Sequence, residues 1–253
     1  MPGIVLPDLA MHFEKAGQGQ PLLLIPGALG TGAGDFSGQI DWFAEREFEV
    51  IAPDPRGYGK SRPPERDYPP DFYTRDAADM FALMSALGHE RFSIIGWSDG
   101  GNVAVIMAAG QPERVAKLVV FGGQSYLTAG EISAFNNIRK ISAWSPRAAE
   151  AMRDVYGDAL EDLWERYVAG QEALFDAGGD LYRALLAKVE CPTFVLHGAR
   201  DPLTPGLHAE AIHRGIAGSR LHVFPEGKHN IHIRYADEFN RLVHAFLIEP
   251  DRS

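Results

Sequence analysis

Short apolar runs alternate with longer amphipathic stretches along most of the chain. Several of the runs are apolar at nearly every position, which predicts strands covered on both faces, as in a parallel sheet. Turn residues such as glycine and proline follow most of them. The predicted strands are Ile4–Leu6, Met11–Lys15, Leu22–Ile25, Phe48–Ala52, Arg91–Ile95, Lys117–Phe121, Thr193–Leu196 and Leu221–Phe224.

Apolar residues between the strands recur at the three- and four-residue spacing of a helix face. One such stripe runs from Tyr73 to Leu87, after a possible capping residue at Asp71 and before Gly88. Further helices are expected over residues 99–110, 205–216 and 235–247. Strands that alternate with helices predict an α/β fold, with a mostly parallel central sheet flanked by helices.

The alternation breaks after Gly123, where strands disappear and helical segments follow one another. We therefore expect a helical cap of residues 124–188, inserted into a core formed by residues 1–123 and 189–253. The predicted cap helices are Ile132–Trp144, Arg147–Tyr156, Leu160–Leu174 and Leu181–Lys188.

One junction between a strand and a helix carries a serine between two glycines. Ser98 lies two residues after Gly96 and two before Gly100. A serine at the tip of a sharp strand-to-helix turn has strained backbone, and the glycines keep Cβ atoms out of the bend. The amide of Asp99 at the helix N-terminus can donate to a developing oxyanion. The pattern predicts Ser98 as a nucleophile.

A serine nucleophile needs a histidine to take its proton and a carboxylate to hold that histidine. In an open α/β sheet these groups belong on loops at the carboxyl ends of strands. Asp201 follows the strand that ends at Leu196, and His229 follows the last strand. We predict Asp201 as the acid and His229 as the base, with the nearby His232 as the alternative base.

The glycine-rich loop after Leu22–Ile25 is the expected source of a second oxyanion donor. We predict the amide of Leu29, with Ala28 as second choice. The loop lacks the lysine of a phosphate-binding loop and the spacing of a dinucleotide fingerprint, so nucleotide binding is not expected. No metal or organic cofactor is expected for this chemistry.

The composition limits the classes of molecule that this protein is expected to bind. The 253 residues are 45% apolar, enough for a sizeable core, and carry a formal net charge of −10. This charge disfavours nucleic acid and anionic membranes as partners and suits a cationic small molecule. A single cysteine, Cys191, allows no internal disulfide. Without a leader or a membrane-length apolar run, we expect a cytoplasmic protein and favour a monomer.

Asp99 is unusual beside a nucleophile, because a carboxylate there opposes the negative charge of the transition state. The residues alone leave two explanations. The helix N-terminus stabilises Asp99 without any role in substrate binding, or Asp99 pairs with a cation on the acyl part of the substrate, such as an α-ammonium group.

Several motifs together resemble the valacyclovir hydrolase family, also called biphenyl hydrolase-like proteins. The resemblance extends from about Leu22 to Leu247 and includes cap residues 140–144. The motifs are Gly96-Trp97-Ser98-Asp99-Gly100-Gly101, Asp54-Pro55-Arg56-Gly57-Tyr58-Gly59, His208–His213 and Pro225-Glu226-Gly227-Lys228-His229-Asn230.

This resemblance implies an α/β-hydrolase fold and a serine hydrolase that cleaves α-amino acid esters. It implies that Ser98 is the nucleophile, that Asp201 and His229 are its partners, and that Asp99 anchors the substrate's α-ammonium group. Ala28 stands where we expect a larger apolar residue in the family, so the acyl pocket is expected to differ in shape.

Other functions remain open at this stage. The same three residues would serve an aminopeptidase or another carboxylic-ester or C–C hydrolase. A receptor with a vestigial triad would bind a small molecule without turnover. A haloalkane dehalogenase is disfavoured, because its nucleophile is a carboxylate and this chain has Ser98 at that position.

Overall fold

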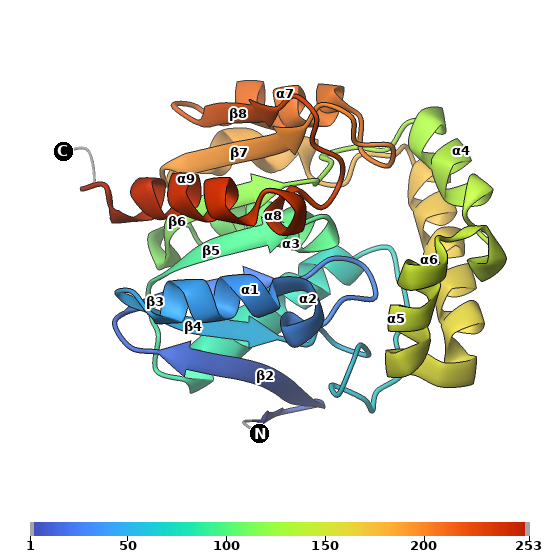
Figure 1. The fold of residues 1–253 in the computed structure, drawn as a ribbon, viewed down its shortest axis with the longest axis horizontal. Coiled ribbons are helices and arrows are strands. Elements are labelled where there is room, and N and C mark those ends of the chain that lie inside the picture. The colour runs from blue at the N-terminus through green and yellow to red at the C-terminus, as the bar shows by residue number, and fades with distance from the viewer. Residues whose placement is uncertain (1–2, 251–253) are drawn as a thin grey trace.

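An eight-stranded sheet forms the centre of the fold in the computed structural model, which describes residues 3–250 (Figure 1). The outer ends of the predicted core, residues 1–2 and 251–253, lie outside the described residues. The strand order is β1-β2-β4-β3-β5-β6-β7-β8. The strands are β1 (Gly3–Leu6), β2 (Leu9–Gly17), β3 (Gln20–Ile25), β4 (Phe48–Pro53), β5 (Phe92–Trp97), β6 (Val115–Phe121), β7 (Thr193–Gly198) and β8 (Arg220–Phe224).

The sheet is parallel from β4 to β8, and β2 is antiparallel to both of its neighbours, β1 and β4. The prediction of a mostly parallel sheet flanked by helices is therefore confirmed. Because parallel strands share a direction, the carboxyl ends of β3 to β8 meet at one edge of the sheet. Figure 1 shows that the loops at this edge face the separate group of helices.

Helices cover both faces of this sheet (Figure 1). One face is covered by α1 (Gly32–Ala44) and α9 (Ala236–Ile248), and the other by α2 (Phe72–Ala86), α3 (Asp99–Gly110) and α7 (Gly206–Gly215). The short helix α8 (Ile231–Arg234) precedes α9, and a 3₁₀ turn at Pro112–Arg114 follows α3.

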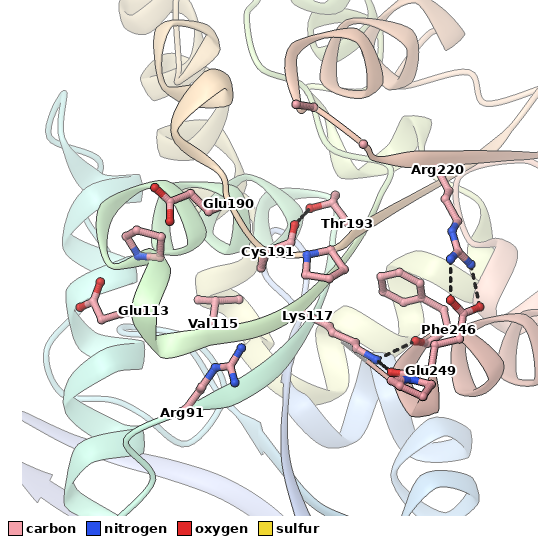
Figure 2. A pocket seen from close by; sticks show the side chains of 15 residues that line it. Arg91, Glu113, Val115, Lys117, Glu190, Cys191, Thr193, Arg220, Phe246 and Glu249 are labelled. Carbon is pink, nitrogen blue, oxygen red and sulfur yellow. Dashed lines mark hydrogen bonds and ion pairs between the residues drawn. The ribbon is translucent and has the colours of Figure 1, made fainter. Parts of the chain in front are cut away.

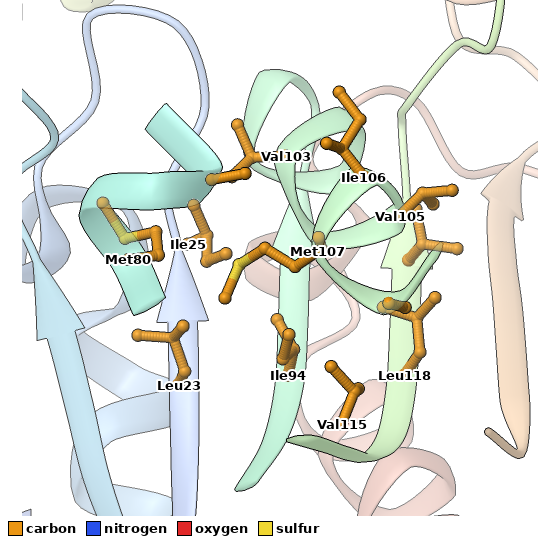
Figure 3. Close-up of a cluster of buried hydrophobic side chains, with 14 of the residues drawn as sticks. Leu23, Ile25, Met80, Ile94, Val103, Val105, Ile106, Met107, Val115 and Leu118 are labelled. Atoms are coloured by element: carbon orange, nitrogen blue, oxygen red, sulfur yellow. The ribbon is translucent and has the colours of Figure 1, made fainter. Parts of the chain in front are cut away.

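Strand β3 illustrates why the strands are apolar at consecutive positions. Leu23 and Ile25 belong to the cluster under α2 and α3 (Figure 3), whereas Leu22 and Leu24 belong to the cluster under α1 and α9. All four are at most 1% exposed. Each such burial contributes about 1.5–3 kcal/mol, so a polar residue at any of these positions would weaken one face of the sheet.

Helix α1 is absent from the elements that the sequence pattern predicts. Glycines at its first, third and seventh positions lower its intrinsic helix propensity, and Phe36 has non-helical backbone angles (φ −122°, ψ 17°). The helix forms because Phe36, Ile40 and Phe43 are buried against the sheet, and because Thr31 caps its start. Tertiary packing therefore overrides propensity in this segment.

Between β6 and β7 the chain leaves the sheet and forms the helices at the far right of Figure 1. The predicted helix over 132–144 ends at Asn137, and its last part is a 3₁₀ turn. The break is stabilised by Trp144 and Trp164, whose indole N–H groups both donate to the carbonyl of Ile138 at 2.8 Å. The elements are α4 (Ala129–Asn137), α5 (Pro146–Tyr156), α6 (Leu160–Asp176) and 3₁₀ turns at Ile141–Ala143, Gly157–Ala159 and Arg183–Lys188.

These helices share one apolar cluster with Leu29 and Tyr58, which belong to loops at the carboxyl edge of the sheet. A buried polar contact is added by His208 of α7, whose Nε2 lies 3.0 Å from the carboxylate of Glu131 in α4. The helical segment is thus packed directly over the loops that carry the predicted site. Among residues 3–250, no helix combines the length and apolar character needed to cross a membrane.

Candidate active site

The turn from β5 into α3 holds Ser98 in strained backbone, with φ 54° and ψ −123°. For a residue with a Cβ this conformation costs on the order of 1–3 kcal/mol. The flanking glycines are required by close contacts: a Cβ on Gly96 would lie 2.4 Å from the carbonyl oxygen of Gly100, and one on Gly100 would lie 2.0 Å from that of Ile25. The turn can therefore be this tight only with glycine at both positions.

Ser98, His229 and Asp201 are brought into one chain of hydrogen bonds. Nε2 of His229 lies 3.1 Å from Oγ of Ser98, and Nδ1 of His229 lies 2.7 Å from Oδ2 of Asp201. The other carboxylate oxygen, Oδ1, accepts the N–H groups of Leu203 at 2.9 Å and Thr204 at 3.0 Å. This arrangement can move a proton from the serine to the histidine.

Asp201 is held ionised although its side chain is only 1% exposed. Burial raises the pKa of Asp201, but the hydrogen bond from His229 and those from the backbone of Thr204 and Leu203 outweigh this effect and lower the pKa below its ordinary value. An ionised Asp201 favours the His229 tautomer with the proton on Nδ1, which leaves Nε2 free to accept from Ser98.

His232, the alternative base, does not reach Ser98. It lies in α8, and its ring packs 4.6 Å from that of Trp97. Nε2 of His232 lies 3.0 Å from the backbone oxygen of Asp35. Burial lowers the pKa of His232 to about 3, so the ring is neutral and part of the core.

The predicted oxyanion loop lies against the serine. Leu29, with φ 59°, lies in a tight turn closed by a backbone hydrogen bond of 3.0 Å from Gly30 to Gly27. A Cβ on Gly27 would lie 3.2 Å from the Cβ of Ser98. Within residues 3–250, no hydrogen bond takes up the N–H of Leu29 or of Ala28. Both amides are therefore available to a substrate oxygen.

A tyrosine of the helical segment holds this turn in place. Tyr156, at the end of α5, donates its hydroxyl to the carbonyl of Leu29 at 2.7 Å and accepts the N–H of Gly59 at 3.2 Å. Its position in a mostly polar helix gave no indication of this contact. The conformation of the turn at Leu29 thus depends on a residue 127 positions away.

Asp99 is 9% exposed and is hydrogen-bonded by two tyrosines that the sequence did not single out. Oδ1 of Asp99 accepts the hydroxyl of Tyr73 at 2.6 Å and that of Tyr167 at 3.1 Å. Burial raises the pKa of Asp99 to about 6, although these two hydrogen bonds act in the opposite direction. The helical stripe that contains Tyr73 predicts that this residue is part of the core. The pattern does not reveal that the hydroxyl of Tyr73 bonds to Asp99.

Ser98, Asp99 and His229 line a cavity of about 20 Å³, closed by Phe135 and Tyr167 from the helical segment. This volume holds roughly one water molecule. Phe135 and Tyr167 thus belong to the part of the structure that a substrate would meet at Ser98. Within residues 3–250, no group of three or more His, Cys, Asp or Glu side chains is arranged to bind a metal ion.

A larger cavity, of about 750 Å³, lies at the opposite end of the sheet, where β6 and β7 begin (Figure 2). Charged side chains of both signs surround it, and Arg220 is paired there with Glu249. None of the predicted site residues lines it. Cavity size therefore does not identify the site in this fold.

The raised pKa of Asp99 predicts a stability cost. Because the folded state holds the Asp99 proton more tightly than the unfolded chain, stability falls as pH rises from about 4 through 6. Asp99→Asn keeps an oxygen for the two tyrosines and removes the charge. We expect its free energy of unfolding to exceed that of wild type by about 2–3 kcal/mol above pH 7, with the difference vanishing near pH 4. Urea unfolding at several pH values measures this, and a pH-independent difference would contradict it.

Comparison with known proteins shows the family of this chain. Residues 20–149 match the family model described as the alpha/beta hydrolase fold. Human serine hydrolase BPHL is 43% identical over 247 residues, covering 96% of this chain and 85% of that protein, and the mouse protein is 45% identical over 240 residues, covering 94% and 82%.

A solved structure of a meta-cleavage product hydrolase from Pseudomonas fluorescens superposes with a TM-score of 0.83, covering 98% of this chain and 97% of that one. Its sequence identity of 22% supports the shared fold alone. The two BPHL proteins, by contrast, match at high identity over almost the whole chain. The chain therefore belongs to the alpha/beta hydrolase fold family, in the group that contains the serine hydrolases BPHL.

Proposed function

We propose that this hydrolase cleaves esters of α-amino acids through an acyl-enzyme formed on Ser98. The acyl-enzyme chemistry is supported by the hydrogen-bond chain from Ser98 through His229 to Asp201, with distances of 3.1 and 2.7 Å. Such a chain lets an alcohol group act as a nucleophile at neutral pH, because the histidine removes its proton as the new bond forms.

In the first step, Oγ of Ser98 attacks the ester carbonyl while Nε2 of His229 takes the hydroxyl proton. The amides of Leu29 and Asp99 stabilise the oxyanion, with Ala28 as the second choice for the former. His229 then returns the proton to the leaving alcohol. Water, activated by His229, attacks the acyl-enzyme and releases the amino acid. The reaction as proposed needs no metal or cofactor, and residues 124–188 act as its cap.

The proposed substrate class rests on Asp99. This carboxylate is next to the nucleophile in sequence and lines the same small cavity. A buried carboxylate without a cationic partner is costly, and an α-ammonium group bonded to the carbon beside the ester carbonyl would supply that partner. The acidic net charge of −10 also favours the approach of a cationic substrate.

Asp99→Asn tests this assignment. We expect it to lower kcat/KM for valine benzyl ester about 100-fold, because the substrate ammonium loses its partner in a buried site. The matching ester without the amine should lose little. Initial rates on both esters, with Ser98→Ala as the blank, measure the difference. Equal losses on the two esters would remove Asp99 as the ammonium anchor and leave the serine hydrolase chemistry intact.

The same assay separates the remaining alternatives. Faster turnover of a valine amide than of the matched ester would indicate an aminopeptidase. Wild type without any Ser98-dependent turnover would favour a binding protein.

That the protein is a monomer in the cytoplasm remains a prediction from the sequence.

A further inference from the structure

Asp99 is hydrogen-bonded from both sides of the site. Tyr73 belongs to α2 of the core, and Tyr167 belongs to α6 of the helical segment. Both hydroxyls reach the same oxygen, Oδ1, at 2.6 and 3.1 Å. Within the described part of the chain, no hydrogen bond reaches Oδ2. Oδ1 thus carries both of these hydrogen bonds, and Oδ2 carries none from residues 3–250.

A third residue determines that Tyr73 donates, and Asp99 accepts, in the shorter of these two hydrogen bonds. Gln171, one turn after Tyr167 on α6, donates its amide Nε2–H to the hydroxyl oxygen of Tyr73 at 3.0 Å. Gln171 is fully buried, and Tyr73 is 4% exposed. Since the Tyr73 oxygen accepts from Gln171, its own hydrogen is left to point at Asp99. A donor aimed at a carboxylate favours the ionised form over the protonated form.

We propose that Tyr73, Tyr167 and Gln171 are positioning residues that keep Asp99 ionised and leave its Oδ2 for the substrate ammonium. This inference rests on the proposed function, in which Asp99 binds that ammonium. Two of the three residues come from α6, so these hydrogen bonds, which favour the ionised form of Asp99, require the helical segment to be packed against the core. Recognition of the amine and closure of the segment are thereby coupled.

The other charged groups around Asp99 do not replace this role. Arg66 and Asp76 line a second small cavity beside Asp99, and they form a buried, two-bond ion pair with each other at 2.6 and 2.7 Å. Arg66 lowers the pKa of Asp99 and Asp76 raises it, so their effects oppose one another. His229 lines the cavity on the Ser98 side. The neighbouring phenols are neutral, because burial raises their pKa values. These phenols are Tyr58, Tyr68 and Tyr182.

The test compares Tyr73→Phe and Tyr167→Phe with wild type. For each protein, kcat/KM is measured from pH 4.5 to 7 on valine benzyl ester and on its des-amino analogue. The ratio of the two values cancels every effect of pH that the two substrates share, and it follows the titration of Asp99. We expect the acidic fall of this ratio to move to higher pH by about one unit for each hydroxyl removed. Gln171→Leu should move it in the same direction by a smaller amount.

Tyr58→Phe is the matched control. Tyr58 is a buried phenol near Asp99, but its hydroxyl bonds to that of Tyr68 at 3.0 Å. Its removal should leave the ratio at every pH unchanged. A uniform loss of activity in the tyrosine variants, without a shift of the pH profile, would show a merely structural role and overturn the proposal.

A substrate-free measurement separates failure of this proposal from failure of the proposed function. Carbon-13 NMR of aspartate-labelled protein, with the Asp99 resonance assigned by its loss in Asp99→Asn, gives the pKa of Asp99 directly. An unchanged pKa in Tyr73→Phe and Tyr167→Phe overturns the role of the tyrosines, whatever the substrate. A raised pKa in enzymes without amine preference would retain their effect on Asp99 and reject its binding of ammonium.

Discussion

Replacing Ser98 by alanine is expected to lower kcat for ester hydrolysis by about five to six orders of magnitude, the loss seen when a serine nucleophile is removed from such a triad. The oxygen that forms the acyl bond is absent in this variant, and His229 has no hydroxyl to deprotonate. Alanine keeps the Cβ atom, so the backbone at φ 54° is as strained as in wild type. The fold and the cavity should therefore be preserved.

Steady-state rates of Ser98→Ala measure the loss of kcat, and its thermal unfolding measures whether the fold is preserved. Ser37→Ala is a suitable control, because Ser37 is an exposed residue of α1 away from the site. The control should match wild type in both measurements. An Ser98→Ala protein with unchanged stability and near-normal turnover would mean that the nucleophile is another residue. Mass spectrometry of wild type during turnover should also detect an acyl group on the peptide that contains Ser98.

Asp201→Asn is expected to lower kcat/KM by about four orders of magnitude. The backbone N–H groups of Leu203 and Thr204 both donate to Oδ1, so the amide oxygen of the new side chain must occupy that position. Its NH₂ group then faces Nδ1 of His229. This arrangement selects the tautomer with the proton on Nε2, which cannot accept the proton of Ser98.

The matched control is Asp180→Asn. Asp180 also accepts a backbone N–H, that of Arg183 at 2.8 Å, but it does not line the site cavity. This variant should keep the wild-type kcat/KM. If Asp201→Asn retained most of the activity while its structure was unchanged, another carboxylate would have to orient His229.

The carboxylate of Asp99 lies beside the proposed oxyanion site, and this has a consequence for specificity. A negative charge there opposes the oxyanion of any substrate. An α-ammonium group neutralises Asp99 before the oxyanion forms, whereas a substrate without the amine leaves it unpaired. We therefore expect amine selectivity to come from the penalty on the wrong substrate as well as from attraction to the right one.

The amino-acid sequence by itself determined the sheet, the turn at Ser98 and the candidates for its partners. Apolar runs specify buried strands because burial on both faces requires apolar side chains at consecutive positions. A Cβ added to Gly100 would lie 2.0 Å from the carbonyl oxygen of Ile25, which explains why a glycine pattern is a dependable mark of this turn. The order of strands then limits where a histidine and a carboxylate can reach the serine.

The tertiary structure alone decided which groups meet. His229 and His232 are three residues apart in the chain, yet one reaches Ser98 and the other is buried against Trp97. The hydroxyls that hold Asp99 come from two helices distant in sequence from it and from each other. Side-chain hydrogen bonds between distant elements leave no periodic pattern, because each depends on a single atom at the end of a residue that otherwise packs as core.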